Sequence, residues 1–81
     1  MARIMVVDDE EKIRSLVKKY ASFEGYEVVE AGSGLEAIEQ LKRTMADLVV
    51  MDVMMPELDG FSTVKEIRKT SRVPVIMLSA R

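Results

Sequence analysis

The segment 48–60 reads Leu-Val-Val-Met-Asp-Val-Met-Met-Pro-Glu-Leu-Asp-Gly and carries the clearest signal of the fold. Its first four residues are apolar, which favours a strand buried on both faces, as in a parallel sheet. Asp52 ends this run, and the following Pro56 and Gly60 are typical of a loop that leads into a helix. Open α/β folds bind ligands at the carboxyl edge of the sheet. The pattern therefore predicts that Asp52 lies at a ligand-binding edge.

A second apolar run, 4–7, ends in the same way, with Asp8 and Asp9 followed by two glutamates. If both strands are parallel, their carboxylates meet at one edge. Like charges repel at close range, so such a cluster is stable mainly with a bound cation. Mg²⁺ typically takes one or two carboxylates, several waters and a phosphate oxygen. The alternative is a purely structural role, in which these aspartates only cap the following helices.

The rest of the chain alternates strands and helices, which predicts right-handed βαβ units and a parallel sheet. Gly25 stops the first helix, Ser33 and Glu36 form a capping box for the second, and Asp59 caps the third. The predicted strands are 3–7, 26–31, 47–51 and 75–78, and the first helix spans 11–23. The apolar residues predicted to face inward are Ile13, Leu16, Val17 and Tyr20 in the first helix, Leu35, Ile38 and Leu41 in the second, and Phe61, Val64 and Ile67 in the third.

The composition is that of one small soluble domain: 81 residues, 48% hydrophobic and 32% charged. The net charge of −2 gives no basic surface for direct nucleic-acid binding. Cysteine and histidine are absent, which excludes thiolate and Ser-His catalysis and leaves oxygen ligands that favour Mg²⁺, Ca²⁺ or Mn²⁺. No apolar stretch approaches a membrane span, and the chain enters its first strand without a signal peptide. These features favour a cytoplasmic location without membrane contact.

Other patterns leave alternatives open. The segment 32–37 matches the dinucleotide pattern G-x-G-x-x-A, but it follows the second strand, and a turn into a capped helix explains its glycines better. Ser79 follows the fourth strand, either as an ordinary strand-end serine or as a hydrogen-bond donor to an anion beside Asp52. Met54 lies in the loop after Asp52, where its backbone carbonyl is a possible metal ligand.

Three segments together, 6–10, 52–60 and 74–80, resemble the receiver domain of two-component response regulators, and the resemblance covers the whole chain. The loop after Asp52 and the segment of the fourth strand are similar in sequence to those of the transcription-factor subfamily that carries a C-terminal winged helix. The resemblance implies an α/β flavodoxin-like, doubly wound parallel sheet, here with strand order 2-1-3-4. It also implies a phosphoacceptor module of phosphorelay signalling rather than an enzyme with turnover.

The resemblance implies a role for each acidic residue. Asp52 would accept a phosphoryl group from the phosphohistidine of a sensor histidine kinase. Asp9 and Asp52 would bind Mg²⁺ directly, with the Met54 carbonyl, and Asp8 would assist through water. A carboxylate needs no neighbouring base to act as a nucleophile, so the absence of histidine is no obstacle.

The resemblance also assigns the residues after the fourth strand. Ser79 would be the switch hydroxyl that hydrogen-bonds the phosphoryl group, and Ala80 the small neighbour that leaves it room. The family's fifth strand, with its phosphoryl-binding lysine, and its last two helices lie past Arg81. We therefore expect residues 1–81 to form a truncated receiver domain with impaired phosphorylation. We also expect self-association, by strand pairing or by exchange of elements, because the fourth strand is an unpaired edge.

Two rival functions follow from the same residues. Aspartate-nucleophile phosphohydrolases also form an aspartyl phosphate, but they have the pattern Asp-x-Asp at the nucleophile. In this chain Met54 occupies the position of the second aspartate. Alternatively, the chain is a non-signalling α/β fragment that only self-assembles.

Overall fold

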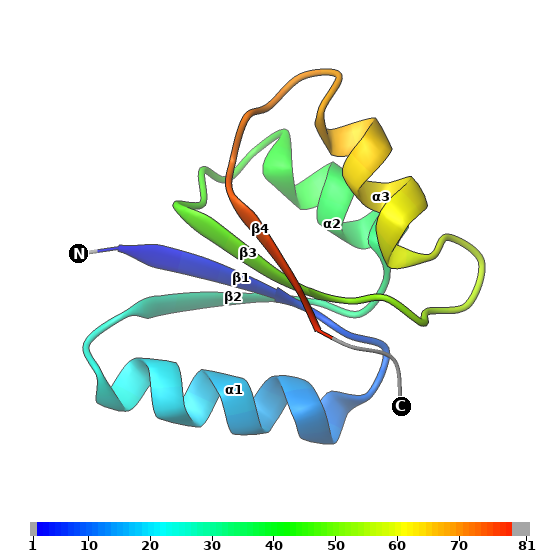
Figure 1. The fold of residues 1–81 in the computed structure, drawn as a ribbon. Helices are drawn as coiled ribbons and strands as arrows, with labels where there is room; N and C mark the ends of the chain where they lie inside the picture. Colours follow the sequence, from blue (N-terminus) through cyan, green and yellow to red (C-terminus); the bar gives the residue numbers. More distant parts are fainter. Residues whose placement is uncertain (1, 79–81) are drawn as a thin grey trace.

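The computed structural model describes residues 2–78 and consists of four strands alternating with three helices (Figure 1). The elements follow the predicted order. In sequence they are β1 (Arg3–Val7), α1 (Glu11–Phe23), β2 (Glu27–Ala31), α2 (Gly34–Leu41), β3 (Leu48–Asp52), α3 (Gly60–Ile67) and β4 (Val75–Leu78).

The four strands form one parallel sheet in the order β2-β1-β3-β4, as predicted. Val7, at the end of β1, lies beside Ala31 of β2 and Met51 of β3. The predicted second strand began one residue early, and the predicted third strand was shifted by one residue, so that Asp52 is the last residue of β3. Strand ends of this kind commonly differ by a residue or two.

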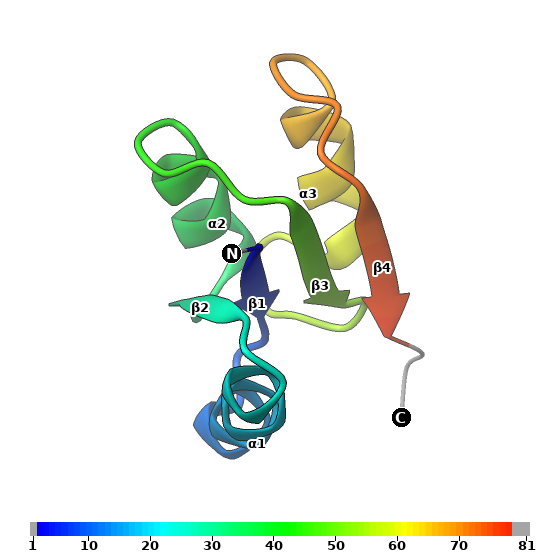
Figure 2. The ribbon, with the colours of Figure 1, turned by 90° about the vertical axis from the view of Figure 1, so that its left-hand side faces the viewer.

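The sheet separates two layers of helices (Figure 2). Helices α2 and α3 lie side by side over one face, and α1 packs against β1 and β2 on the other. The main core fills the space between the sheet and the α2–α3 layer. Its buried members are Met5, Val7, Ala31, Ala37, Val49, Met51, Met55, Ile67 and Val73.

The predicted helix boundaries are confirmed by their caps. Ser33 Oγ accepts the Glu36 N–H at 3.0 Å, and the Glu36 carboxylate accepts the Gly32 N–H at 2.8 Å, one residue before the usual partner of a capping box. Asp59 accepts the Ser62 N–H at 2.7 Å. At the end of α1, Gly25 has φ of +93°, a conformation that glycine adopts without strain.

The prediction of the inward helix faces was wrong for Leu16, Tyr20, Leu35 and Phe61, which are all exposed. In α2 and α3 the buried residues are small instead: Gly34 and Ala37 in α2, and Gly60, Thr63 and Ile67 in α3, of which only Ile67 is large. Large apolar side chains marked the pattern in the sequence, whereas close approach of the two helices requires small ones.

The face of the sheet that α1 covers becomes more exposed towards β4. Residues in register on parallel strands point to the same face, and Glu30, Val6, Val50 and Ile76 form such a row. Glu30 binds Arg14 of α1, so this is the face of α1. Along the row, Val6 is 1% exposed, Val50 is half-buried and Ile76 is 52% exposed. Helix α1 therefore protects the β1 side of this face and leaves β4 accessible.

Candidate phosphoacceptor and metal site

Three carboxylates meet at the carboxyl edge of the sheet, as the sequence predicted. Asp8 follows β1 directly, and Asp52 ends β3, its neighbour in the sheet. Asp9 comes next in the chain, and one carboxylate oxygen from each of the three aspartates lies within 4.8 Å of the others. The topology places them together because parallel strands end at the same edge.

The three aspartates differ in their surroundings. Asp8 and Asp52 are each 1% exposed, whereas Asp9 is exposed. The Glu10 N–H donates to Asp8 Oδ1 at 2.9 Å, and the Met54 N–H donates to Asp52 Oδ1 at 3.4 Å. Each buried carboxylate is thus oriented by an amide two residues further along the chain. The cluster has two oriented carboxylates inside and a third open to water.

Arg14 supports the cluster from α1, a role that sequence reasoning missed. Its Nη1 donates to the Asp8 backbone carbonyl at 2.7 Å, and its Nε donates to Glu30 Oε1 at 3.1 Å. The Arg14 side chain is largely buried between the helix and the strands. The only signal was its position next to Ile13 on the predicted inner face of the helix. Arg14 is a positioning residue, because it fixes the backbone of Asp8.

The loop after β3 is drawn back against the strand by a glycine. The Gly60 N–H donates to the Val53 carbonyl at 2.9 Å. A Cβ atom at Gly60 would lie 2.5 Å from the Asp52 carbonyl oxygen and 3.0 Å from Val53 Cα. Both are backbone atoms, which cannot move aside like the end of a side chain. Glycine at this position thus allows α3 to begin directly beside Asp52.

The same loop contains a tight turn at Glu57. The Leu58 N–H donates to the Pro56 carbonyl at 2.7 Å, and Glu57 between them has φ of +68°. A three-residue turn with positive φ is a rare and strained conformation for a residue with a side chain. The turn reverses the loop between the end of β3 and the start of α3.

The donor set fits a hard divalent cation. Carboxylate oxygens are the ligands that Mg²⁺, Ca²⁺ and Mn²⁺ prefer. The exposed Asp9 leaves one side of the cluster open, and Mg²⁺ keeps several waters when it binds to proteins. Met54 also lies at the cluster through its backbone N–H. Two further predicted site residues, Ser79 and Ala80, lie outside the described residues.

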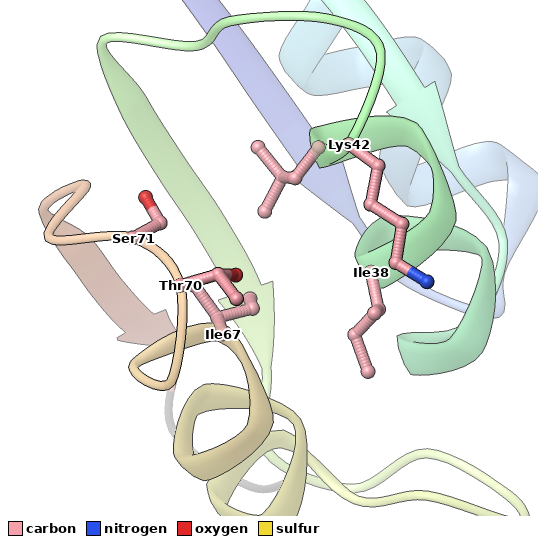
Figure 3. Close-up of a pocket in the computed structure, with 6 residues that line it drawn as sticks. Ile38, Lys42, Ile67, Thr70 and Ser71 are labelled. Atoms are coloured by element: carbon pink, nitrogen blue, oxygen red, sulfur yellow. The ribbon is translucent and has the colours of Figure 1, made fainter.

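A separate pocket of about 330 Å³ opens between the C-terminal ends of α2 and α3 (Figure 3). It lies at the opposite edge of the sheet, because both helices begin at the carboxyl edge and run back. The only ionic side chain in its lining is Lys42, which pairs with Glu39. Its lining residues are Ile38, Leu41, Lys42, Ile67, Thr70 and Ser71. The pocket therefore takes no part in the acidic site.

Within residues 2–78, none of the helices combines the length and the apolar character that crossing a membrane requires.

Comparison with known proteins places these features in a family. Residues 4–81 match the model of the response regulator receiver domain. The chain is 47% identical over 78 residues to the probable transcriptional regulator ycf27 of Porphyridium aerugineum, covering 96% of this chain and 32% of that protein. It is 46% identical over 81 residues to the CpxR homologue of Haemophilus influenzae, a transcriptional regulatory protein, covering 100% of this chain and 35% of that protein. The chain thus spans about a third of the length of these relatives.

Solved structures agree with this assignment. The chemotaxis protein CheY4 of Vibrio cholerae superimposes with a TM-score of 0.95 at 36% identity, over 100% of this chain and 70% of that one. The receiver domain of the Francisella response regulator 1452 gives 0.92 at 37% identity, over 99% and 67%. The chain belongs to the response regulator receiver domain family of two-component signalling, and its fold is the flavodoxin-like fold of that family.

Proposed function

We propose that Asp52 is the phosphoacceptor of this receiver domain. A carboxylate oxygen of Asp52 forms a bond to phosphorus while the P–N bond of a phosphohistidine in a sensor histidine kinase breaks. The observation that carries this proposal is the meeting of Asp8, Asp9 and Asp52 at the carboxyl edge of a receiver fold. Only Asp52 of the three belongs to a strand, so its carboxylate is held directly by the sheet.

We assign the metal-binding roles to the same cluster. Asp9 and Asp52 would hold Mg²⁺ directly, together with the Met54 carbonyl, and Asp8 would act through a bound water. The ion supplies charge neutralisation and alignment of the phosphoryl oxygens when it is bound. Asp8 and Asp52, both buried, contribute fixed negative charge, and the exposed Asp9 provides the entry side.

The remaining roles rest on the family resemblance. Ser79 is proposed as the hydroxyl that hydrogen-bonds the phosphoryl group, and Ala80 as its small neighbour. The family's phosphoryl-binding lysine is not among the 81 residues. We therefore propose that this 81-residue chain takes up phosphate more slowly than a receiver domain with the fifth strand. A role in the regulation of transcription is proposed because the relatives are named as transcriptional regulators. A cytoplasmic location is proposed from the family resemblance.

The test is the intact mass of the chain after incubation with Mg²⁺ and acetyl phosphate. We expect one added phosphoryl group in the unsubstituted 81-residue chain, called the parent below, and none in Asp52→Asn. Asp47→Asn is the matched control, because Asp47 lies at the opposite edge of the sheet beside Arg3 and must leave the uptake intact. Uptake by Asp52→Asn equal to that of the parent would overturn the assignment of the acceptor.

We also propose that the 81-residue chain associates with a second copy of itself through β4. Among residues 2–78, this strand pairs with β3 alone, so its other edge offers backbone groups for pairing. Next to that edge, Ile76 is exposed on the α1 face of the sheet, in the part of that face that the helix leaves uncovered. An apolar face beside an open strand edge is suited to pairing with another strand or to an exchange of elements between copies.

This association is tested by size-exclusion chromatography coupled to light scattering, over a range of protein concentrations. We expect dimers or larger species in the parent and a shift to monomers in Ile76→Lys. Leu35→Lys, which changes an exposed leucine on α2 in the other layer, is the control and must behave like the parent. A parent that is monomeric at every concentration contradicts the proposal.

A further inference from the structure

Two methionines differ from the others in the described part of the chain by their exposure. Met5, Met51 and Met55 are buried, and Met77 is half-buried. By contrast, Met45 is 84% exposed and Met54 is 63% exposed. Exposed thioethers are the ones that peroxides reach, and oxidation converts them into polar sulfoxides. By exposure alone, Met45 is the more accessible of the two.

The two methionines lie at opposite edges of the sheet. The Met54 N–H is 3.4 Å from Asp52 Oδ1, so in any rotamer its sulfur lies within roughly 9 Å of that oxygen by covalent reach. Met45 accepts a hydrogen bond from Arg3 through its carbonyl, at the start of β1. Asp8 is five residues after Arg3 along this extended segment, which places the carboxylate cluster about 16 Å from Arg3. Only Met54 is close to the carboxylates.

We propose that Met54 is a metal-directed oxidation site, at which a redox-active divalent cation in the carboxylate cluster directs peroxide to this thioether. The inference depends on the proposed metal site at Asp8, Asp9 and Asp52. An oxygen-donor site built for Mg²⁺ also accepts Fe²⁺, because such a site selects weakly among divalent ions and Fe²⁺ binds at least as tightly as Mn²⁺. The oxidant is hydrogen peroxide.

The chemistry balances with two Fe²⁺ ions, each of which is oxidised once. Two Fe²⁺ ions reduce two molecules of hydrogen peroxide to two hydroxide ions and two hydroxyl radicals and become two Fe³⁺. The Met54 sulfur loses two electrons to the two radicals, forms one S–O bond and releases one water. Hydroxyl radicals react close to where they form, so the nearest exposed thioether is oxidised first. The product is a reversible polar modification beside the phosphoacceptor.

One peptide contains both the site and its control. Cleavage by trypsin after Arg43 and Lys65 gives residues 44–65, which carry Met45 and Met54 together with two buried methionines. Fragment ions of this peptide locate the added oxygen, and differences in ionisation cancel. With peroxide alone, we expect Met45 to be oxidised at least as fast as Met54. With Fe²⁺ and peroxide, we expect the ratio of Met54 to Met45 sulfoxide to rise at least tenfold.

Two controls separate the outcomes. Asp9→Asn changes an exposed ligand with little risk to folding, and an excess of Mg²⁺ needs no substitution; both should return the ratio to its value with peroxide alone. Mn²⁺ binding, followed by electron paramagnetic resonance, is measured in parallel. Mn²⁺ binding without a change in the ratio overturns the oxidation site and leaves the metal site standing. Failure to bind Mn²⁺ overturns the proposed metal site, and the oxidation site with it.

Discussion

At the scale of single residues, charge governs the acidic site. The sequence places Asp8 and Asp9 side by side, and the fold adds Asp52 within 4.8 Å. Without a cation, three carboxylates this close raise the free energy of the folded state through mutual repulsion. The proposed ion would therefore stabilise the folded state, and the change in the free energy of unfolding when the ion is removed measures that contribution.

The first prediction concerns Asp9. Without divalent ions, Asp9→Asn should raise the free energy of unfolding by about 0.5 kcal/mol, because repulsion between exposed charges is partly screened by water. With Mg²⁺ the order should reverse, because the parent gains ligand-linked stability that the variant lacks. Urea unfolding, carried out once with EDTA and once with Mg²⁺, measures the free energy of unfolding of both proteins under the two conditions. Glu57→Gln removes one exposed charge outside the cluster and should not show the reversal.

The second prediction concerns the end of α1. The Gly25 N–H donates to the Ser22 carbonyl at 3.0 Å, and the Tyr26 N–H donates to Ala21 at 3.0 Å, which is the Schellman pattern. It requires the positive φ of Gly25.

Gly25→Ala should therefore lower the free energy of unfolding by about 1–2 kcal/mol. Gly32→Ala is the control, because Gly32 has no positive φ and its added Cβ would meet only side-chain atoms at 3.4 Å or more. Chemical denaturation of both variants decides the point, and equal losses would contradict the role of Gly25.

At the scale of elements, small residues set how closely α2 and α3 pack. A Cβ atom at Gly34 would overlap the Thr63 hydroxyl and lie 3.1 Å from the Leu58 carbonyl oxygen. Thr63 is fully buried, and its hydroxyl donates to the Asp59 carbonyl at 2.7 Å. The glycines of segment 32–37, which match a dinucleotide pattern, thus serve a turn and a helix contact.

The third prediction tests this contact. Gly34→Ala should lower the free energy of unfolding by about 1–3 kcal/mol, because the helices must separate. Thr63→Ala removes the overlapping oxygen, so the double variant should lose less than the sum of the two single losses. Unfolding of all four proteins completes the cycle. Strict additivity would show that the two residues do not press on each other.

At the scale of the whole molecule, the two layers of helices are unequally anchored. None of the residues of α1 is buried, whereas α2 and α3 each bury at least two. Local opening needs less free energy where fewer apolar contacts are lost. Helix α1 is instead held at its inner face by Arg14 and Lys18, which both pair with Glu30.

The fourth prediction follows from this difference. In hydrogen exchange followed by mass spectrometry, the amides of α1 should exchange at least tenfold faster than those of β1 and β3, whose opening requires global unfolding. The experiment is repeated at several protein concentrations, because association through β4 would add protection to the sheet. Equal protection of α1 and β1 would contradict the picture of a weakly anchored helix.

Much of this architecture was predictable from the sequence. The apolar runs that end in Asp8 and Asp52, the capping residues Ser33 and Asp59, and the stop at Gly25 all act locally. Local patterns of this kind are readable without a structure, and the element order and the meeting of the carboxylates were confirmed. The strand order, which the family resemblance implied, was also confirmed.

Where the helices begin, and where α1 ends, was readable from the sequence alone, because hydrogen bonds between near neighbours fix those points. The rotation of each helix against the sheet, by contrast, depends on contacts made in the folded structure. Leu16 and Phe61 are exposed although they fit an apolar stripe, while Arg14 turns inward to reach Glu30 and the Asp8 carbonyl. These two partners of Arg14 lie outside the helix, six and 16 residues away in the chain. A helix face is therefore chosen by the shape and charge of what it meets, which no local pattern contains.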